Sequence, residues 1–598
     1  SYNVAVGYNA GESVSTGTNN TIIGGLAGDS LTTASNNVAL GYQALSTEDT
    51  GGRNIAIGYQ ALLNQNYDGY AYNVAMGYSA GKEITTGKQN TIMGGLAGDA
   101  LTTGEDNVAL GYNALSTEDT GHRNTAIGKN ALSTLNYDGS GHNVAVGYNA
   151  GQGVSTGVAN TIMGALAGDA LTTGSYNQAI GYNALSAEDA GNRTTAIGYF
   201  ALANQDYDGD ANNVAVGHSA GQNLTTGIDN VFIGGSTAES ITTASGNVAI
   251  GRNALGDETT GGSNVAIGKY AMSSSQLSQH NVAIGVDALQ NVTNDTLKNT
   301  YNIGIGYQAG NDITTGEKNV LIGGLAGDNM TTASHNIGIG YHAIGGVTTG
   351  SNNIVLGGHA GLALTSGNNS VLIGYETGDA LTTGSRNVAI GHQALSAEDE
   401  HGRNVAIGFM ALNAQNAGAE GYNTAVGYNA GGTISSGIQN TILGASAGDV
   451  LTTGSFNTAL GYSALGAEDT GNRSTAVGYE ALSLQNYNGD AYNTACGMWA
   501  GKVVSTGRSN SFLGYLAGGA LTTGSSNTAV GYEALSTEDA GGASVAVGYQ
   551  ALKTQDGGDT FNTALGYRAG YLITTGPYNT LIGGLAGDAI TEGSNNVA

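Results

Sequence analysis

Short apolar runs separated by polar, glycine-bearing segments repeat along the whole chain. Asn3 is followed by Val-Ala-Val and then Gly7, and the pattern returns as NTIIGGLA at Asn20, NVALGYQA at Asn37 and NIAIGYQA at Asn54. Each apolar run has the two-residue alternation of a strand, and the chain shows no helical spacing of apolar residues. Short strands between glycine turns at a fixed period predict a parallel β-solenoid.

The spacing of the leading asparagines defines the repeat. The heads at residues 3, 20, 37, 54 and 73 are 17, 17, 17 and 19 residues apart, so four rungs form a super-repeat of 70 residues. We therefore predict an all-β fold, a parallel β-solenoid or β-roll of about 34 rungs of mostly 17 residues, in the form of a homotrimeric rod.

The sequence shows no linker and no change of composition, so we expect one continuous solenoid domain over residues 1–598. It starts at a rung boundary and stops within a rung, which indicates a segment of a longer chain. The super-repeats lie near residues 3–72, 73–142, 143–212, 213–301 (irregular), 302–422, 423–492, 493–561 and 562–598.

Within a rung, the head asparagines are expected to stack as an amide ladder, and the fifth-position glycines to allow a bend. Strand alternation sends the third residue to one face and the fourth to the other, so we expect Val6 in the core and Ala5 at a surface of close approach. The second half of each rung carries one apolar anchor, at the ninth or the twelfth position. The ladder residues of the first rungs are Asn3, Asn20, Asn37, Asn54, Asn73 and Asn90, with Gly7, Gly24, Gly41 and Gly58.

Composition limits the partners. The net charge of −28 disfavours binding to nucleic acid and to anionic membranes. No apolar run has the length of a membrane span, so we expect no membrane insertion in this segment. The single cysteine, Cys496, excludes a disulfide framework and a thiolate metal cluster.

The unit N-[VT]-A-[VI]-G-Y-[NQ]-A-L, followed by a Thr-Gly turn, resembles two groups of repeats. One is the head repeat of trimeric autotransporter adhesins, whose rungs carry a similar VAIG core. The other is the repeat of phage and prophage tail fibres, written much like NTAIGYNAL…TTGNN at this spacing. The resemblance covers essentially the whole chain, and it implies a parallel β-roll, often a homotrimer, that displays or forms a binding fibre outside the cell.

The expected function is therefore a structural and adhesive extracellular filament without catalysis, a phage-like tail fibre or a bacterial surface fibre. The alternatives are an adhesin head that binds a host or matrix surface, and a carbohydrate-active solenoid enzyme. The expected partners are further copies of the chain, as a homotrimer and by end-to-end assembly, and a cell-surface glycan or protein receptor. A monomeric solenoid is the alternative to the trimer, which is favoured because small third-position residues would let three faces meet at one axis.

Recognition is expected in the longer loops of every fourth rung, because insertions on one face of a solenoid often form its binding face. The candidate contact residues are Tyr67, Asp68, Tyr137, Asp138, Tyr207, Asp208 and Tyr487. No cofactor is expected. A calcium site at Asp206, Asp208 and Asp210 is the alternative to a plain acidic turn there.

Two further patterns have structural interpretations. Tyrosines that follow the glycine, such as Tyr8 and Tyr42, are expected to stack on one another rather than on sugar rings. Repeated Glu-Asp pairs, such as Glu48-Asp49, precede an arginine, Arg53. A glycosidase needs one unique carboxylate pair across a cleft, so we expect local surface ion pairs instead.

Overall fold

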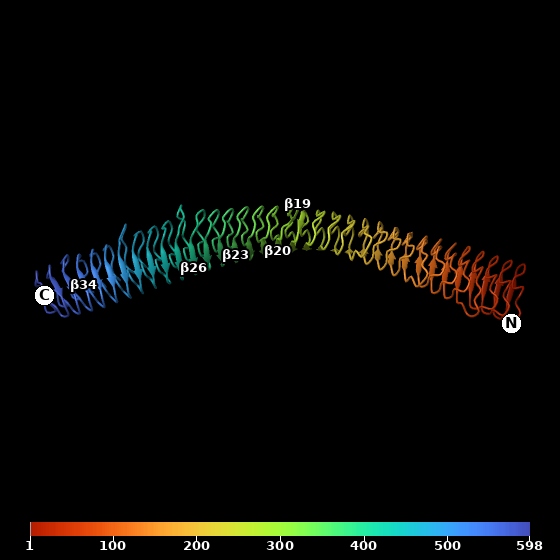
Figure 1. Ribbon diagram of the computed structural model, residues 1–598, viewed down its shortest axis with the longest axis horizontal. Coiled ribbons are helices and arrows are strands. Elements are labelled where there is room, and N and C mark those ends of the chain that lie inside the picture. The colour runs from red at the N-terminus through yellow and green to blue at the C-terminus, as the bar shows by residue number, and fades with distance from the viewer. Residues whose placement is uncertain (1) are drawn as a thin grey trace. The chain divides into compact units, whose positions relative to one another are not determined.

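The computed structural model describes residues 2–598 and contains strands, turns and loops but no helix in that range. The chain divides into two compact units, of which the first ends at Tyr301 and the second is Asn302–Ala598. The boundary coincides with the predicted end of the irregular super-repeat. Within each unit the strands follow one another in chain order, as the succession β20, β23, β26 and β34 shows in the second unit (Figure 1).

The strands of the first unit are β1 (Val4–Val6), β2 (Thr21–Ile23), β3 (Val38–Leu40), β4 (Ile55–Ile57), β5 (Val74–Met76), β6 (Thr91–Met93), β7 (Val108–Leu110), β8 (Thr125–Ile127), β9 (Val144–Val146), β10 (Thr161–Met163), β11 (Gln178–Ile180), β12 (Thr195–Ile197), β13 (Val214–Val216), β14 (Val231–Ile233), β15 (Val248–Ile250), β16 (Val265–Ile267), β17 (Gln276–Gln279), β18 (Val282–Ile284) and β19 (Thr293–Asn299).

The strands of the second unit are β20 (Ile303–Ile305), β21 (Val320–Ile322), β22 (Ile337–Ile339), β23 (Ile354–Leu356), β24 (Val371–Ile373), β25 (Val388–Ile390), β26 (Val405–Ile407), β27 (Thr424–Val426), β28 (Thr441–Leu443), β29 (Thr458–Leu460), β30 (Thr475–Val477), β31 (Thr494–Cys496), β32 (Ser511–Leu513), β33 (Thr528–Val530), β34 (Val545–Val547), β35 (Thr563–Leu565) and β36 (Thr580–Ile582).

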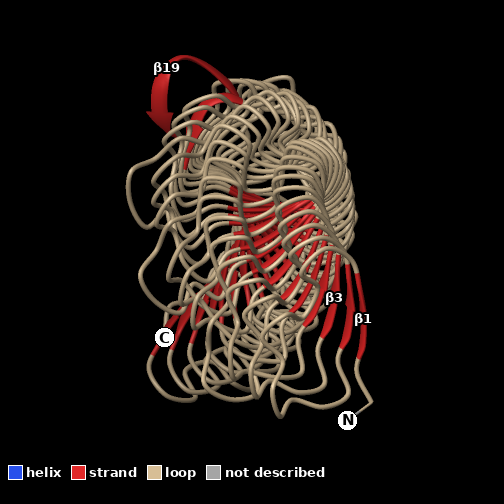
Figure 2. Ribbon diagram, turned by 90° about the vertical axis from the view of Figure 1, so that its right-hand side faces the viewer, coloured by secondary structure: helices blue, strands red, loops and turns tan. Residues whose placement is uncertain are grey.

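All strands except β17 and β19 belong to the parallel ladder, which has 34 strands. Each strand pairs in register with the strand of the next rung, as Val4 with Thr21 and Thr21 with Val38. The strands occupy one side of the coil and turns make up the rest (Figure 2). The predicted parallel β-solenoid of mostly 17-residue rungs is confirmed.

The fifth-position glycines are required by the contact between rungs. Gly7 has φ +143°, and a Cβ on it would lie 2.4 Å from the carbonyl oxygen of Gly24. The same contact would be 2.2 Å between Gly58 and Gly77, in a longer rung. No side chain fits at that separation, so the column must be glycine from rung to rung.

The core is narrow, and apolar residues at the ninth or twelfth position of the rung fill its second half. Leu45 lies at the ninth position with φ +56°, while the corresponding Gly28 leaves room for Leu31 at the twelfth. A Cβ on Gly28 would lie 2.6 Å from Leu31 Cδ1, so a side chain at Gly28 would clash with Leu31 as it is placed. Leu31 and Leu45 are both fully buried, as the predicted alternation requires, but some rungs depart from it, because Leu132 and Leu135 bury both positions of one rung.

The predicted faces of the strand are wrong. The third-position residues, such as Ala39 and Ala56, are fully buried, whereas fourth-position residues, such as Leu40, are exposed. In the first rung, Ala5 therefore occupies the inward position and Val6 the outward one, the reverse of the prediction. The third position is alanine in most rungs and a larger residue, such as Ile22 or Phe232, in others, and these residues are buried in both cases. The side chains of the second and fourth positions point outward.

The head asparagines are buried and bond mainly to backbone rather than to one another. The Asn20 backbone N–H donates to Asn3 Oδ1 at 2.9 Å, and Asn20 Nδ2 donates to the Ala34 carbonyl at 2.8 Å. Asn37 repeats this arrangement with Asn20 Oδ1 and the Gly51 carbonyl. Each asparagine therefore joins its own turn to the next rung, and amide-to-amide bonds such as Asn90 Nδ2 to Asn73 Oδ1 are an addition.

The 19-residue rungs change this ladder. Asn54 Nδ2 has no hydrogen-bond partner, because the longer loop carries the turn carbonyl away. In the corresponding rung headed by Thr194, the buried Gln205 Nε2 donates to the Thr194 hydroxyl at 2.9 Å. The same bond joins Gln485 to Ser474 and Gln555 to Ser544, which explains why a hydroxyl replaces asparagine at these heads.

One rung of the first unit departs from the regular pattern. Strand β17 pairs in parallel with β19, and their register shifts between Gln276 and Ser278. Most of β19 is exposed, and it lies apart from the main ladder (Figure 2). The irregular stretch predicted near this place is therefore a small second sheet.

The ladder predicts unequal costs for the same substitution. Asn37→Thr removes two buried hydrogen bonds, whereas Asn54→Thr removes one, from the Asn73 N–H, and adds a hydroxyl that Gln65 can reach, as in the Thr194 rung. We expect Asn37→Thr to cost about 1–3 kcal/mol more than Asn54→Thr. Denaturant unfolding of the two full-length variants measures the difference, and equal losses would contradict the role given to the ladder.

Candidate functional site

Counted from the head residue of each rung, the second and fourth positions are the first and last residues of the ladder strand, and their side chains form what we call the outward sheet face. Its fourth-position side chains are large and partly exposed, with 42% exposure at Met163 and Leu443 and 51% at Leu513. The second positions are valine, isoleucine or threonine, with Gln178 and Ser511 the exceptions. The face is an apolar sheet surface that no other described part of its unit covers.

The outward sheet face carries no charge. In all 34 ladder strands, no second or fourth position holds Asp, Glu, Lys or Arg. The chain as a whole has a net charge of −28, and its carboxylates therefore lie outside the ladder strands. Exposed apolar areas of this extent mark interaction sites in soluble proteins.

Aromatic side chains at the sixth position form a row beside this face. The ring centroids are 5.6 Å apart from Tyr42 to Tyr59 and 5.2 Å apart from Tyr59 to Tyr78. A second run stacks Tyr515, Tyr532, Tyr549 and Tyr567 at 5.0 to 5.4 Å. The predicted self-stacking of these tyrosines is present, and the rings remain partly exposed.

The loops predicted for recognition are tied to the preceding rung. Tyr67, Tyr137 and Tyr207 are half-buried, and their backbone N–H groups donate to a glutamate of that rung. Asp68 and Asp138 are exposed, and each accepts a bond from a threonine of the preceding turn. Asp208 is exposed, and Tyr487 is half-buried in the corresponding loop of the second unit.

The arginines do not pair with the Glu-Asp pair of their own turn, so that prediction is wrong. Arg53 lies over the Tyr70 ring at 4.1 Å, and Arg193 Nη1 is 2.5 Å from Asp210 Oδ2. Both partners belong to the loop of the following rung. The arginines therefore fasten the long loops to the stack.

The calcium candidate is not assembled as predicted. Asp210 pairs with Arg193, and Asp206 lies near Glu188 and Asp189 rather than near Asp208 and Asp210. The Glu188 oxygens accept hydrogen bonds from the Gly191 N–H and from Gln205 Nε2. The cluster is thus satisfied by the protein itself.

The glutamates of the Glu-Asp pairs are buried, contrary to the predicted surface position. Glu48 is fully buried, and its Oε1 accepts the Gly51 N–H at 2.6 Å. Burial raises the pKa of Glu48 to about 7, against the lowering effect of bonds from Gly51 and Tyr67. Burial also raises the pKa of Glu118, Glu188 and Glu468.

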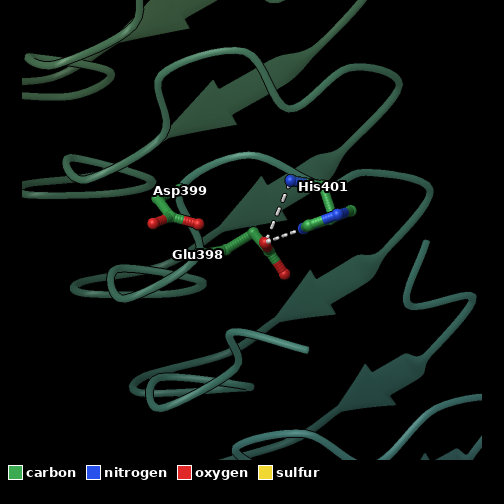
Figure 3. Close-up of side chains that lie close together, drawn as sticks. All are labelled: Glu398, Asp399 and His401. Carbon is green, nitrogen blue, oxygen red and sulfur yellow. Dashed lines mark hydrogen bonds and ion pairs between the residues drawn. The ribbon is translucent and has the colours of Figure 1, made fainter. Parts of the chain in front are cut away.

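A histidine joins one of these glutamates. Glu398, Asp399 and His401 bring one ligand atom each within 4.8 Å of one another, and the Glu398 carboxylate lies between the other two (Figure 3). His401 Nδ1 is 3.8 Å from Glu398 Oε1. Burial raises the pKa of Glu398 to about 7. Similar clusters without histidine are Glu188-Asp189-Asp206 and Glu538-Asp539-Asp556.

A shallow hollow of about 420 Å³ lies in the second unit. Lys502 and Glu480 form an ion pair of 2.5 Å at its edge, and Trp499 Nε1 donates to Glu480 Oε2 at 3.1 Å. The hollow is lined by Asp449, Val450, Ser463, Gly466, Ala467, Glu480, Ser483, Leu484 and Lys502. Of the lining side chains, Glu480 and Lys502 pair with each other, and among the described residues no hydrogen bond joins a nucleophile of this lining to a base as in a hydrolytic site.

In comparisons with known proteins, no family model matches the chain and no curated protein matches it. The described residues hold no helix with the length and apolar character that crossing a membrane requires.

Sequence reasoning missed the outward sheet face and the buried glutamates. The signal for the face is the absence of charge at both outward positions of every ladder strand. The burial of the glutamates could have been predicted from their place in the rung. Glu48 stands at the twelfth position, which points into the core in rungs such as the one that contains Leu31.

The raised pKa of Glu48 predicts a pH dependence. Because the folded-state pKa of about 7 exceeds the ordinary 4.5, the stabilising contribution is fully present below pH 4.5 and is lost as the pH rises through 7. We expect the melting temperature to fall from pH 5 to pH 8 by less in Glu48→Gln than in the wild type. Glu12→Gln, at an exposed carboxylate, is the control, and an unchanged slope in Glu48→Gln would contradict the prediction.

Proposed function

We propose that the protein is a non-catalytic structural fibre that associates with further copies of itself through the outward sheet face. In this proposal it works outside the cell, as a phage-like tail fibre or a bacterial surface filament. Its long-rung loops are presented for attachment to a cell-surface glycan or protein. The observation that carries the proposal is the uncharged outward sheet face of a strongly acidic chain.

The size of the face supports an extensive contact. Each unit offers two outward side chains from every ladder strand, among them Leu443, Leu460 and Leu513 in the second unit. Homomeric interfaces that persist in solution bury about 2,000 Å² or more, and they resemble a protein core in composition. Two sheet faces can pack at about 10 Å with their side chains interleaved.

The period of the face favours a copy of the same chain as partner. Parallel rungs repeat about every 4.8 Å, and the rows of outward side chains repeat with them. A partner that fills the grooves along the whole length must have the same period. Another molecule of this solenoid has the same period, because it consists of the same rungs.

The distribution of charge also favours self-association. Two molecules of net charge −28 repel each other wherever their carboxylates approach. On the outward sheet face they meet without a charged side chain, because the carboxylates lie outside the ladder strands. A basic partner would find no acidic group on this face to pair with.

The proposed copy number is a homotrimer, with contacts that differ from those first expected. Third-position alanines such as Ala39 are in the core of their own solenoid, so they do not form the contact at a threefold axis. The outward sheet face takes that role in the proposal. An adhesin head is the second candidate function, supported by the exposed loop carboxylates Asp68, Asp138 and Asp208, which recur at every fourth rung.

Charges introduced on the outward sheet face test the proposal. We expect the triple variant Leu443→Lys, Leu460→Lys and Leu513→Lys to sediment as a monomer where the wild type sediments as an oligomer. Leu484→Lys is the matched control, because Leu484 is 51% exposed but lies off the sheet face. A monomeric wild type, or an equally associated triple variant in sedimentation velocity, would refute the proposed interface.

A further inference from the structure

His401 occupies a turn position that is small in the corresponding rungs. Gly51, Gly191 and Gly471 hold this place elsewhere, and a Cβ on any of them would lie 2.4 to 2.5 Å from an oxygen of the nearby glutamate. At His401 the loop accepts a side chain larger than Cβ beside the same glutamate, Glu398. A large residue such as His401, at a position where the corresponding rungs have glycine and where it brings no evident gain in stability, is a candidate for a functional role.

The change leaves Glu398 with fewer hydrogen bonds than its counterparts. Glu398 Oε1 accepts the His401 N–H at 3.1 Å, but Oε2 is buried without a partner, and so is His401 Nδ1. In the counterpart rung, Glu468 Oε2 accepts Gln485 Nε2 at 2.7 Å. A fully buried carboxylate oxygen without a donor is costly, and it calls for a cation or a proton.

The neighbouring amides cannot supply the missing bond as placed. Gln415 corresponds to Gln485, but Gln415 Nε2 has no hydrogen-bond partner. Asn404 heads this rung where Ser474 heads the counterpart, and Asn404 Nδ2 is likewise unpartnered. The Ser474 hydroxyl accepts a hydrogen bond from Gln485, but the corresponding Asn404 has an unpartnered amide N–H₂ group instead of a hydroxyl. The hydrogen-bond network that satisfies Glu468 is therefore absent around Glu398.

We propose that Glu398, Asp399 and His401 form a binding site for one divalent transition-metal ion of the zinc class. Their ligand atoms lie within 4.8 Å of one another, and small rotations of the side chains bring them around one ion (Figure 3). One imidazole nitrogen and two carboxylates suit Zn²⁺ and Co²⁺, with water at the remaining position. The buried, unpartnered Glu398 Oε2 and His401 Nδ1 are the second observation that points to an ion.

The two clusters without histidine do not share this property. Glu188 and Glu538 each accept bonds to both carboxylate oxygens, from a turn glycine and from a glutamine amide. They therefore serve as internal comparisons on the same chain. The proposed site adds a function to the fibre and does not depend on self-association.

The test uses the untagged full-length chain and Co²⁺ as a spectroscopic probe, with calorimetric titration of Zn²⁺. We expect one saturable equivalent per chain and a Co²⁺ visible band typical of a four-coordinate site. His401→Gly, which restores the residue found at Gly51 and Gly471, should fold normally and bind about tenfold more weakly or not at all. Glu398→Gln and Asp399→Asn should each weaken binding, while His359→Asn should leave it unchanged.

Two results would overturn the proposal. One is the absence of a saturable Co²⁺ band in the wild type. The other is unchanged Zn²⁺ affinity and stoichiometry in His401→Gly, which would assign the binding to other histidines. Equal binding of Ca²⁺ that survives His401→Gly would also refute it, because oxygen ligands alone would then account for the ion. Circular dichroism and melting curves of His401→Gly separate loss of ligand from loss of fold.

Discussion

The close approach of consecutive rungs at the fifth-position glycine is the constraint on which the structure depends. The Gly7 Cα faces the Gly24 carbonyl so closely that a methyl group would lie 2.4 Å from its oxygen. That contact keeps the strands in register and brings each asparagine within reach of the next rung's backbone. The narrow interior then takes the third-position column, mostly alanine but with larger residues such as Ile22 and Phe232, together with the anchors of the second half of the rung. The second- and fourth-position residues of the strand are left on the outer face.

Every inward position must then be satisfied within this narrow interior. The twelfth position points inward whether it holds Leu31 or Glu48. A leucine there needs only contacts, but a glutamate needs donors, which the Gly51 and Tyr67 N–H groups provide. The long loop of the following rung thus supplies a bond that the buried carboxylate requires.

The repeat spacing was sufficient to predict the solenoid, its rung length and the alternation between anchors such as Leu31 and Leu45. Alternation alone did not predict which strand face is buried. It places Ala39 and Leu40 on opposite faces of the strand, but it does not say which of the two faces lies in the narrow interior. Side-chain size suggested the wrong answer at Val6, since large apolar residues are also common on protein surfaces. The cluster around His401 depends on the loop conformation of one rung, and spacing carries no information about it.

The buried network also determines how such a chain can change in length. Glu468 requires Gln485 in the next rung, and Gln485 in turn bonds Ser474 and Asn493, so this network spans three consecutive rungs and crosses into the following super-repeat. Removing or duplicating one rung would separate the glutamate from its donors, whereas removing or duplicating 70 residues within the regular super-repeats keeps the spacing between them. Genetic recombination between super-repeats therefore offers this protein a graded series of lengths that differ by whole groups of four rungs and share one internal chemistry.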